Sequence, residues 1–167
     1  MMRAPAPIGH IGITVPDVDA AARWYGLVLG WELLLGPLDK SSDDSHLSDQ
    51  IRDAFGEPNI SFRQAYLLTS NEITIEFFQF LTPRPTSGMN TFDYWNVGVS
   101  HLCVVEPEID QLVTRIVEHG GRQRMPVRRM FSADVYRFCY CEDPYGNVIE
   151  ITTRPHVEAI RALSARL

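Results

Sequence analysis

The sequence predicts an α+β fold built from two copies of one unit, each a strand, a helix and three further strands. Two observations predict it: an internal repeat at a constant offset of 91 residues, and strand-like apolar alternation on both sides of a helical pattern in each copy. The chain has 167 residues, 45% of them hydrophobic, which suffices for one average domain or two very small ones. The repeat favours one structure made from two copies, each too small to hold a site alone.

The two copies match most clearly where the first strand leads into the first helix. Residues 9–19 read GHIGITVPDVD, and residues 100–110 read SHLCVVEPEID. His10 and His101 therefore occupy equivalent positions, each at the start of a strand. In both copies a proline with acidic neighbours then opens a helix, where negative charge favours the helix dipole.

The elements of the first copy follow from its pattern of apolar residues. Its helix carries Ala21, Trp24, Tyr25 and Val28 at helical spacing, and Gly30 is well placed as a C-terminal cap. A long Asp- and Ser-rich insert follows, within which Ser48 is a candidate cap for a short helix. The predicted order is a strand near Ile11–Val15, a helix over Val18–Leu29, a strand over Trp31–Leu35, the insert over Gly36–Ile60 with a helix over Asp49–Phe55, and strands over Ser61–Thr69 and Glu72–Leu81.

The second copy repeats this order without the insert. Its helix carries Leu112, Val113, Ile116 and Val117, and Gly121 stands where Gly30 stands in the first copy. The predicted elements are a strand near Leu102–Val104, a helix over Ile109–His119, strands over Arg122–Met125, Val135–Cys141 and Asn147–Thr152, and a C-terminal helix over Pro155–Leu167.

These elements predict a modular organisation. We expect residues 1–82 to form the first module with an insert at 36–60, residues 83–96 a linker rich in Pro and Gly, residues 97–153 the second module, and residues 154–167 a C-terminal helix or tail. An insert of this length is typical of a functional lid or of a disordered segment, and the sequence leaves both open.

Composition and charge exclude several function classes. The net charge is −6, with 15 Lys and Arg against 21 Asp and Glu, so the global basic field that nucleic acid requires is absent. The apolar runs are too short for a membrane span, and the N-terminus lacks the apolar core of a signal peptide. The odd count of three cysteines favours a reducing cytoplasm. We therefore expect neither a nucleic-acid nor a membrane partner.

Four polar residues occupy parallel positions in the two copies and are the candidate site. His10 and His101 begin the first strands, while Glu76 and Glu150 interrupt apolar final strands. A carboxylate buried in a strand must meet a cation, a donor or water, although either glutamate alone could lie on a solvent face. Two imidazoles and two carboxylates form a mixed nitrogen and oxygen set suited to a divalent first-row metal.

Three motifs resemble the vicinal oxygen chelate superfamily. They are HIGITVPDVD at residues 10–19, WYGLVLGWE at 24–32 and EDPYGNVIEI at 142–151, and the resemblance covers about residues 8–153. This family includes glyoxalase I, methylmalonyl-CoA epimerase, extradiol dioxygenases, and fosfomycin and bleomycin resistance proteins. The resemblance implies paired βαβββ modules that form a curled mixed sheet around a metal-binding cleft.

The resemblance also implies a ligand set and a chemistry. The family's metal ligands map onto His10, Glu76, His101 and Glu150, which favours the glyoxalase and epimerase branches. The metal would be Zn, Ni, Co, Mn or Fe, and no organic cofactor site is assigned. A metal-stabilised enediolate would let a glutamate act as the base, with Glu150 the leading candidate and Glu76 its counterpart.

The expected function is therefore a glyoxalase-like lyase or isomerase acting on a small α-oxo, hemithioacetal or acyl-thioester substrate. Two alternatives remain: a non-enzymatic small-molecule binding protein of the bleomycin-resistance type, or an extradiol-type dioxygenase using ferrous iron. Open sheet edges in such small modules need covering, so we expect a homodimer.

Two further groups are candidates for substrate contact. Several arginines of the second copy could clamp an anion, although solvated surface charge explains them as well. A set of aromatic residues in and after the first copy could line an apolar pocket, although core packing explains most of them. The arginines are Arg122, Arg124, Arg128, Arg129 and Arg137, and the aromatic residues are Phe62, Tyr66, Phe78, Phe92 and Trp95.

Overall fold

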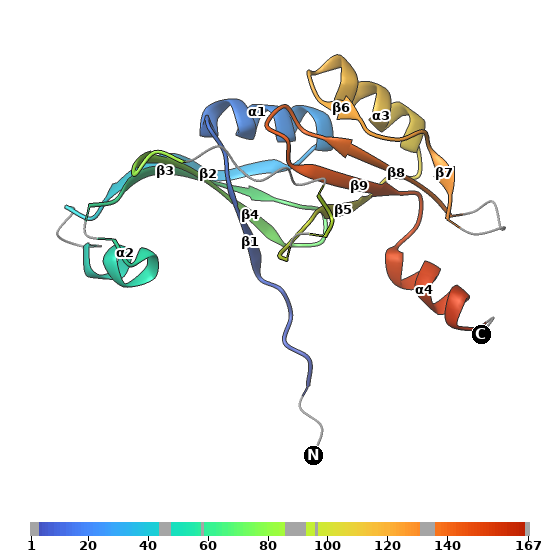
Figure 1. Cartoon of the computed structure of the whole chain (residues 1–167), viewed down its shortest axis with the longest axis horizontal. Helices are drawn as coiled ribbons and strands as arrows, with labels where there is room; N and C mark the ends of the chain where they lie inside the picture. The colour runs from blue at the N-terminus through green and yellow to red at the C-terminus, as the bar shows by residue number, and fades with distance from the viewer. Residues whose placement is uncertain are drawn as a thin grey trace. The chain divides into compact units, whose positions relative to one another are not determined.

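A computed structural model describes residues 4–43, 48–57, 59–85, 93–95, 97–130 and 136–165 of the chain. The chain divides into two compact units, Met1–Ser87 and Gly88–Leu167. Each unit holds one mixed sheet and the helix that covers it (Figure 1). The predicted α+β class and the repeated βαβββ order are confirmed. None of the helices in the described residues is long and apolar enough to cross a membrane.

The first unit contains a four-stranded sheet. Its strands lie in the order β1-β4-β3-β2, with β1 parallel to β4 and the other pairs antiparallel. The elements are β1 (His10–Thr14), α1 (Val18–Leu29), β2 (Glu32–Ser41), α2 (Ser48–Phe55), β3 (Ser61–Leu68) and β4 (Thr74–Thr82). The first and last strands are neighbours, and the start of β1 lies beside the start of β4, with His10 paired to Thr74 and Gly12 to Glu76.

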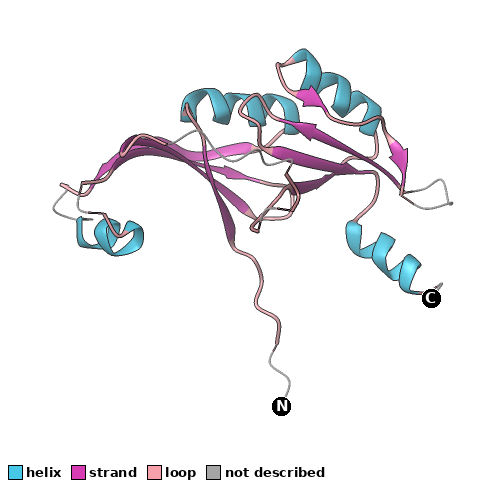
Figure 2. Ribbon diagram, viewed as in Figure 1, coloured by secondary structure: helices cyan, strands magenta, loops and turns pink. Residues whose placement is uncertain are grey.

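Helix α1 is held at both ends and buries one stripe against the sheet. The Asp17 side chain accepts a hydrogen bond from the backbone N–H of Ala20 at 2.9 Å, and Gly30 closes the helix in the left-handed conformation. Tyr25 is fully buried and packs against Trp31 and Phe77 with ring centroids 4.9 and 4.8 Å away. Burial of such a side chain contributes roughly 1.5–3 kcal/mol. α1 therefore covers one face of the sheet (Figure 2).

Strand β2 is longer than the sequence predicts. The prediction ended the strand at Leu35, but pairing with β3 resumes at Leu38 and continues to Ser41. The register shifts around Gly36, where φ is +101° and an added Cβ would lie only 2.5 Å from the backbone oxygen of Gln64. Only glycine fits this close approach, so the Gly-Pro pair forms a bulge within the strand instead of ending it.

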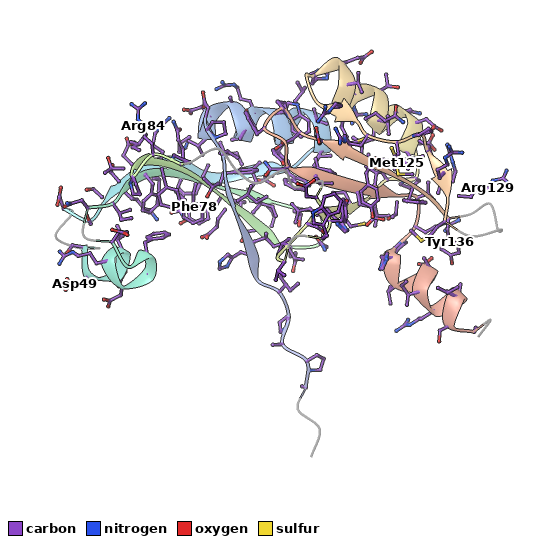
Figure 3. All side chains as sticks on the ribbon, viewed as in Figure 1. Asp49, Phe78, Arg84, Met125, Arg129 and Tyr136 are labelled. Atoms are coloured by element: carbon purple, nitrogen blue, oxygen red, sulfur yellow. The ribbon has the colours of Figure 1, made fainter. Side chains whose placement is uncertain are left out.

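Helix α2 packs on the sheet face opposite α1. Its Phe55 ring lies 5.5, 6.1 and 5.4 Å from the rings of Phe62, Phe78 and Phe80, and Ile51 is buried in the same cluster. Figure 3 shows Phe78 on this face. The described part of the predicted insert thus consists of the end of β2, a turn and a helix packed on aromatic residues.

The second unit repeats the arrangement with shorter strands. They lie in the order β5-β9-β8-β6, while β7, which the sequence did not predict, pairs with β8. The face of this sheet that carries Cys139, Cys141, Ile149 and Ile151 is buried with α3. The elements are β5 (Leu102–Val105), α3 (Ile109–Glu118), β6 (Arg122–Gln123), β7 (Arg128–Arg129), β8 (Arg137–Glu142), β9 (Val148–Thr152) and α4 (His156–Ser164).

The end of α3 differs from the prediction. Its C-cap is His119, and the positive φ of 84° falls on Gly120 instead of Gly121. At Gly121 an added Cβ would lie 2.6 Å from the Ile116 side chain and 2.5 Å from the Glu142 backbone oxygen. Gly121 is therefore required for close helix–strand approach and not for capping.

Candidate metal centre

In the first unit, a histidine and a glutamate from adjacent strands face each other. Nε2 of His10 lies 3.5 Å from a carboxylate oxygen of Glu76, and their side chains are 60% and 19% exposed. The neighbours of Glu76 in β4, Ile75 and Phe77, are buried on the α1 side. Since side chains alternate along a strand, Glu76 points to the opposite face, where His10 meets it.

The second unit holds the equivalent pair in a more enclosed setting. Nε2 of His101, the residue before β5, lies 3.1 Å from a carboxylate oxygen of Glu150 in β9. These side chains are 27% and 8% exposed. The hydroxyl of Ser100 lies 2.9 Å from Nδ1 of His101, which leaves Nε2 for the carboxylate or for another ligand.

Each unit thus presents one imidazole nitrogen beside one carboxylate, a donor set that suits a first-row divalent ion. Two donors are fewer than the four to six that such an ion takes. Among the residues that the structure describes, no group of three or more His, Cys, Asp or Glu side chains is gathered to hold a metal. The structure brings together the two members of each predicted pair, and the four-residue set requires one pair from each unit.

Two tyrosines that sequence reasoning did not assign to the metal site stand beside the glutamates. Tyr66 is paired across strands with Glu76, and Tyr140 is paired in the same way with Glu150. In both copies the tyrosine precedes its glutamate by 10 residues. This repeated spacing is the signal that could have identified them, because equal spacing across an antiparallel pair places both residues on one face.

Aromatic rings surround His101. Its ring centroid lies 5.9 Å from that of Tyr94 and 5.4 Å from that of Tyr140, and the two tyrosine rings are 5.6 Å apart. Burial, followed by the charge of Glu150, raises the pKa of Tyr140 well above its usual range. Its hydroxyl is therefore neutral at physiological pH, and it is hydrogen-bonded to Tyr94.

Cys103 lies on the same face as Glu150, directly across from it in β5. Burial is the main cause that raises the pKa of Cys103 to about 11, and the charge of Glu150 adds to it. The thiol is therefore protonated at neutral pH.

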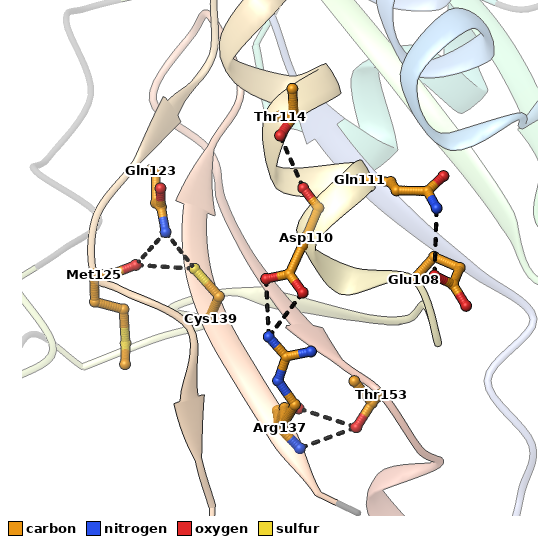
Figure 4. A network of polar contacts seen from close by, with 9 residues as sticks. All are labelled: Glu108, Asp110, Gln111, Thr114, Gln123, Met125, Arg137, Cys139 and Thr153. Carbon is orange, nitrogen blue, oxygen red and sulfur yellow. Dashed lines mark hydrogen bonds and ion pairs between the residues drawn. The ribbon is translucent and has the colours of Figure 1, made fainter.

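Three of the five arginines singled out in the second unit form ion pairs with acidic residues of the same unit. Arg122 and Arg124 both pair with Glu142, at 2.5 and 3.5 Å. Arg137 binds both carboxylate oxygens of Asp110 in α3 at 2.8 Å, as Figure 4 shows. Arg137 shares the α3 side of β8 with Cys139 and so points away from the Glu150 face.

The five aromatic residues singled out in the sequence lie in different settings. Phe62 and Phe78 pack under α2 as core, as the favoured interpretation held, whereas Trp95 is 80% exposed. Phe92 lies outside the described residues. Tyr66 is the member of the set that lies beside a candidate metal ligand.

The comparisons with known proteins bear on the family and the fold. The profile of the Glyoxalase/Bleomycin resistance protein/Dioxygenase superfamily matches residues 7–151. This match covers most of the chain, which therefore belongs to that superfamily. The predicted resemblance to the vicinal oxygen chelate superfamily is confirmed. A search of curated protein sequences found no match.

Solved structures show the same fold at low sequence identity. A glyoxalase family protein from Bacillus cereus is 20% identical, with a TM-score of 0.75 over 90% of this chain and 95% of that one. The fosfomycin resistance protein FosX from Listeria monocytogenes is 13% identical, with a TM-score of 0.60 over 95% and 99%. A glyoxalase I mutant from Zea mays is 14% identical, with a TM-score of 0.59 over 88% of this chain but 45% of that one.

Proposed function

We propose that this chain is a metal-dependent lyase or isomerase of the glyoxalase type. Its substrate would be a small α-oxo, hemithioacetal or acyl-thioester compound. The observation that carries the proposal is the His–Glu contact that recurs at equivalent positions of the two units, at 3.5 Å in the first and 3.1 Å in the second. Membership of a superfamily that includes enzymes acting through divalent metals supports it.

The proposed metal ligands are His10, Glu76, His101 and Glu150, acting as one set. FosX from Listeria monocytogenes has been crystallised with Mn(II), so a fold of this kind can hold such an ion. A bound divalent ion would polarise the carbonyl group of the substrate and make the neighbouring proton acidic. Zn, Ni, Co, Mn and Fe are all compatible with these nitrogen and oxygen donors.

The chain's own residues would move the proton and orient the substrate. Glu150 is the proposed base because it is the more enclosed carboxylate, 8% exposed against 19% for Glu76. A carboxylate shielded from water exchanges its proton with a bound substrate more readily than with solvent. Tyr140, across the strand pair from Glu150, and its hydrogen-bonded neighbour Tyr94 would line the side of the substrate next to this base.

A substrate panel on protein reconstituted with each metal tests this proposal. We expect turnover of a hemithioacetal or an acyl-CoA thioester, with solvent deuterium entering the carbon next to the carbonyl. A Glu150→Gln variant should lose this exchange while an Arg23→Gln variant, changed on exposed α1 surface, should keep it. Oxygen uptake with catechols and ferrous iron would instead establish the dioxygenase alternative. Binding without turnover across the panel would establish a sequestering protein and overturn the proposal.

We also propose a cytoplasmic homodimer. β2 is an edge strand, and four of its leucines are 38–53% exposed, which suits an apolar interface. These leucines are Leu33, Leu34, Leu35 and Leu38. The cysteines of the chain are free thiols, in keeping with a reducing compartment. Light scattering of the wild type and of a Leu34→Glu variant tests the dimer: the variant should be monomeric, and a monomeric wild type would contradict the proposal.

A further inference from the structure

The chain has one lysine, and the structure places it on the sheet face that carries Glu76. Lys40 lies near the end of β2, in the part of the strand that continues beyond the Gly36 bulge. Its ammonium donates to the side-chain oxygen of Gln64 at 2.5 Å and to the hydroxyl of Tyr66 at 3.2 Å. The ammonium also lies 5.6 Å from the centre of the Tyr66 ring.

The partners of Lys40 are neutral. No Asp or Glu among the described residues forms an ion pair with it, whereas Arg52 and Arg63 of the same unit both pair with aspartates. This is unusual because residues 1–96 hold 12 acidic and only 6 basic residues. An ammonium has three donors and two are used here, so one donor and a full positive charge remain for a ligand.

The groups that hold the ammonium are themselves fixed. Gln64 is only 4% exposed, and its side-chain oxygen also accepts a hydrogen bond from Tyr66 at 2.7 Å. Because this buried amide oxygen accepts hydrogen bonds from both Lys40 and Tyr66, it holds the lysine ammonium in one position. Tyr66 is in turn the cross-strand partner of Glu76, so the pinned charge lies one side chain away from a proposed metal ligand.

The second unit differs from the first at the equivalent tyrosine. There the equivalent tyrosine, Tyr140, packs against Tyr94 and His101 instead of a lysine. The lysine held by a buried amide is therefore a feature of the first unit.

We propose that Lys40, held by Gln64 and Tyr66, is an anion-binding subsite that selects substrates with a carboxylate or phosphate group several bonds from the reacting carbonyl. The inference rests on the proposed function for its link to catalysis. Binding of the anion itself depends only on the first unit. An oxyanion would take the unused donor of the ammonium and compensate its charge.

The single lysine makes a direct test possible on the metal-free full-length chain. Reductive methylation with formaldehyde labels Lys40 and the N-terminal amine, which serves as an internal control. We expect malonate to slow the labelling of Lys40 and not that of the N-terminus, and the neutral analogue malonamide to slow neither. Equal labelling with and without malonate, or equal protection by malonamide, would overturn the proposal.

Charge-matched variants separate this subsite from a general effect of charge. In calorimetry, Lys40→Gln should weaken malonate binding about tenfold, the size expected for one charge-assisted hydrogen bond. Arg23→Gln, which removes the same charge from exposed α1 surface, should not, and equal loss in both variants would overturn the subsite. Lys40→Gln should also bind divalent metal as the wild type does. If the wild type binds no metal but malonate still protects Lys40, the proposed function fails and the subsite stands.

Discussion

The two His–Glu pairs join the same kinds of atoms at similar distances, but their surroundings differ. In the first unit His10 is 60% exposed and its partner Glu76 lies next to a tyrosine that contacts a lysine. In the second unit His101 is 27% exposed, packs against two tyrosine rings, and faces a glutamate that is 8% exposed. The repeat therefore supplied one His–Glu pair twice. The residues around each pair distinguish a more open half, with Lys40 nearby, from a more enclosed half with two tyrosines.

This difference suggests a division of roles. The enclosed pair suits proton transfer, because water is kept from its carboxylate. The open pair, with Lys40 nearby, suits recognition of a charged group on the substrate. Each of the following variants compares the two halves, and they run from the largest expected effect to the smallest.

The two glutamate variants should show the largest difference, and they should differ in turnover. We expect Glu150→Gln to lower turnover by roughly 10²–10⁴-fold, the usual contribution of a general base. Glu76→Gln should lower turnover less and act mainly through metal affinity. Steady-state rates at saturating metal measure both variants. Equal loss of turnover at saturating metal would mean that the more enclosed carboxylate is not the base.

The aromatic cluster under α2 exists in the first unit alone and should contribute strongly to stability. Phe62 is 3% exposed and packs against Phe55, Phe78 and Phe80. Phe62→Ala should cost about 3–5 kcal/mol of unfolding free energy, because it leaves a cavity. Urea unfolding measures this loss. A cost below about 1 kcal/mol would show that α2 does not pack on this cluster.

The histidines should differ in their effect on stability. His101→Ala leaves the enclosed Glu150 without its imidazole partner, so we expect a loss of about 1–3 kcal/mol in the metal-free protein. His10→Ala changes an exposed side chain and should stay within about 0.5 kcal/mol of wild type. Thermal and urea unfolding at low ionic strength compare them. The reverse order would contradict the difference in enclosure.

The smallest effect is expected at Arg137. Its pair with Asp110 is largely solvent-exposed, so Arg137→Gln should cost only about 0.2–1 kcal/mol. Because this arginine points to α3 and not to the Glu150 face, substrate KM should be unchanged. A large rise in KM would restore the interpretation of this residue as a substrate clamp.

The sequence predicted the elements that local pattern defines and missed those that tertiary contact defines. The helix Val18–Leu29 was predicted with its bounds, because its proline, acidic cap and glycine directly flank the segment. β2 was cut short at Gly36, because a Gly-Pro pair normally ends a strand and only the contact with Gln64 shows that it forms a bulge. That error also placed Lys40 in a loop.

In the candidate site, too, the residues that local pattern marks were predicted and those that only tertiary contact reveals were missed. Both His–Glu pairs were predicted because a carboxylate is conspicuous in an apolar strand, and the structure brings each pair into contact. Tyr66 and Tyr140 were missed as a pair because a tyrosine in a strand resembles core packing. Gln64 and Lys40 contact each other only through the bulged register of β2, which no local pattern reveals.

The central claim is that the two equivalent pairs act as one metal site, and the stoichiometry of metal binding tests it most directly. Titration of the metal-free full-length chain with Mn(II) or Ni(II) should show one ion per chain. His10→Ala and His101→Ala should each lower the affinity of that single binding event. The double variant should bind the metal only slightly less tightly than the single variant of lower affinity, because both histidines hold the same ion. Two independent binding events, each removed by one histidine variant, would contradict the shared site, and the absence of binding would contradict a metal centre altogether.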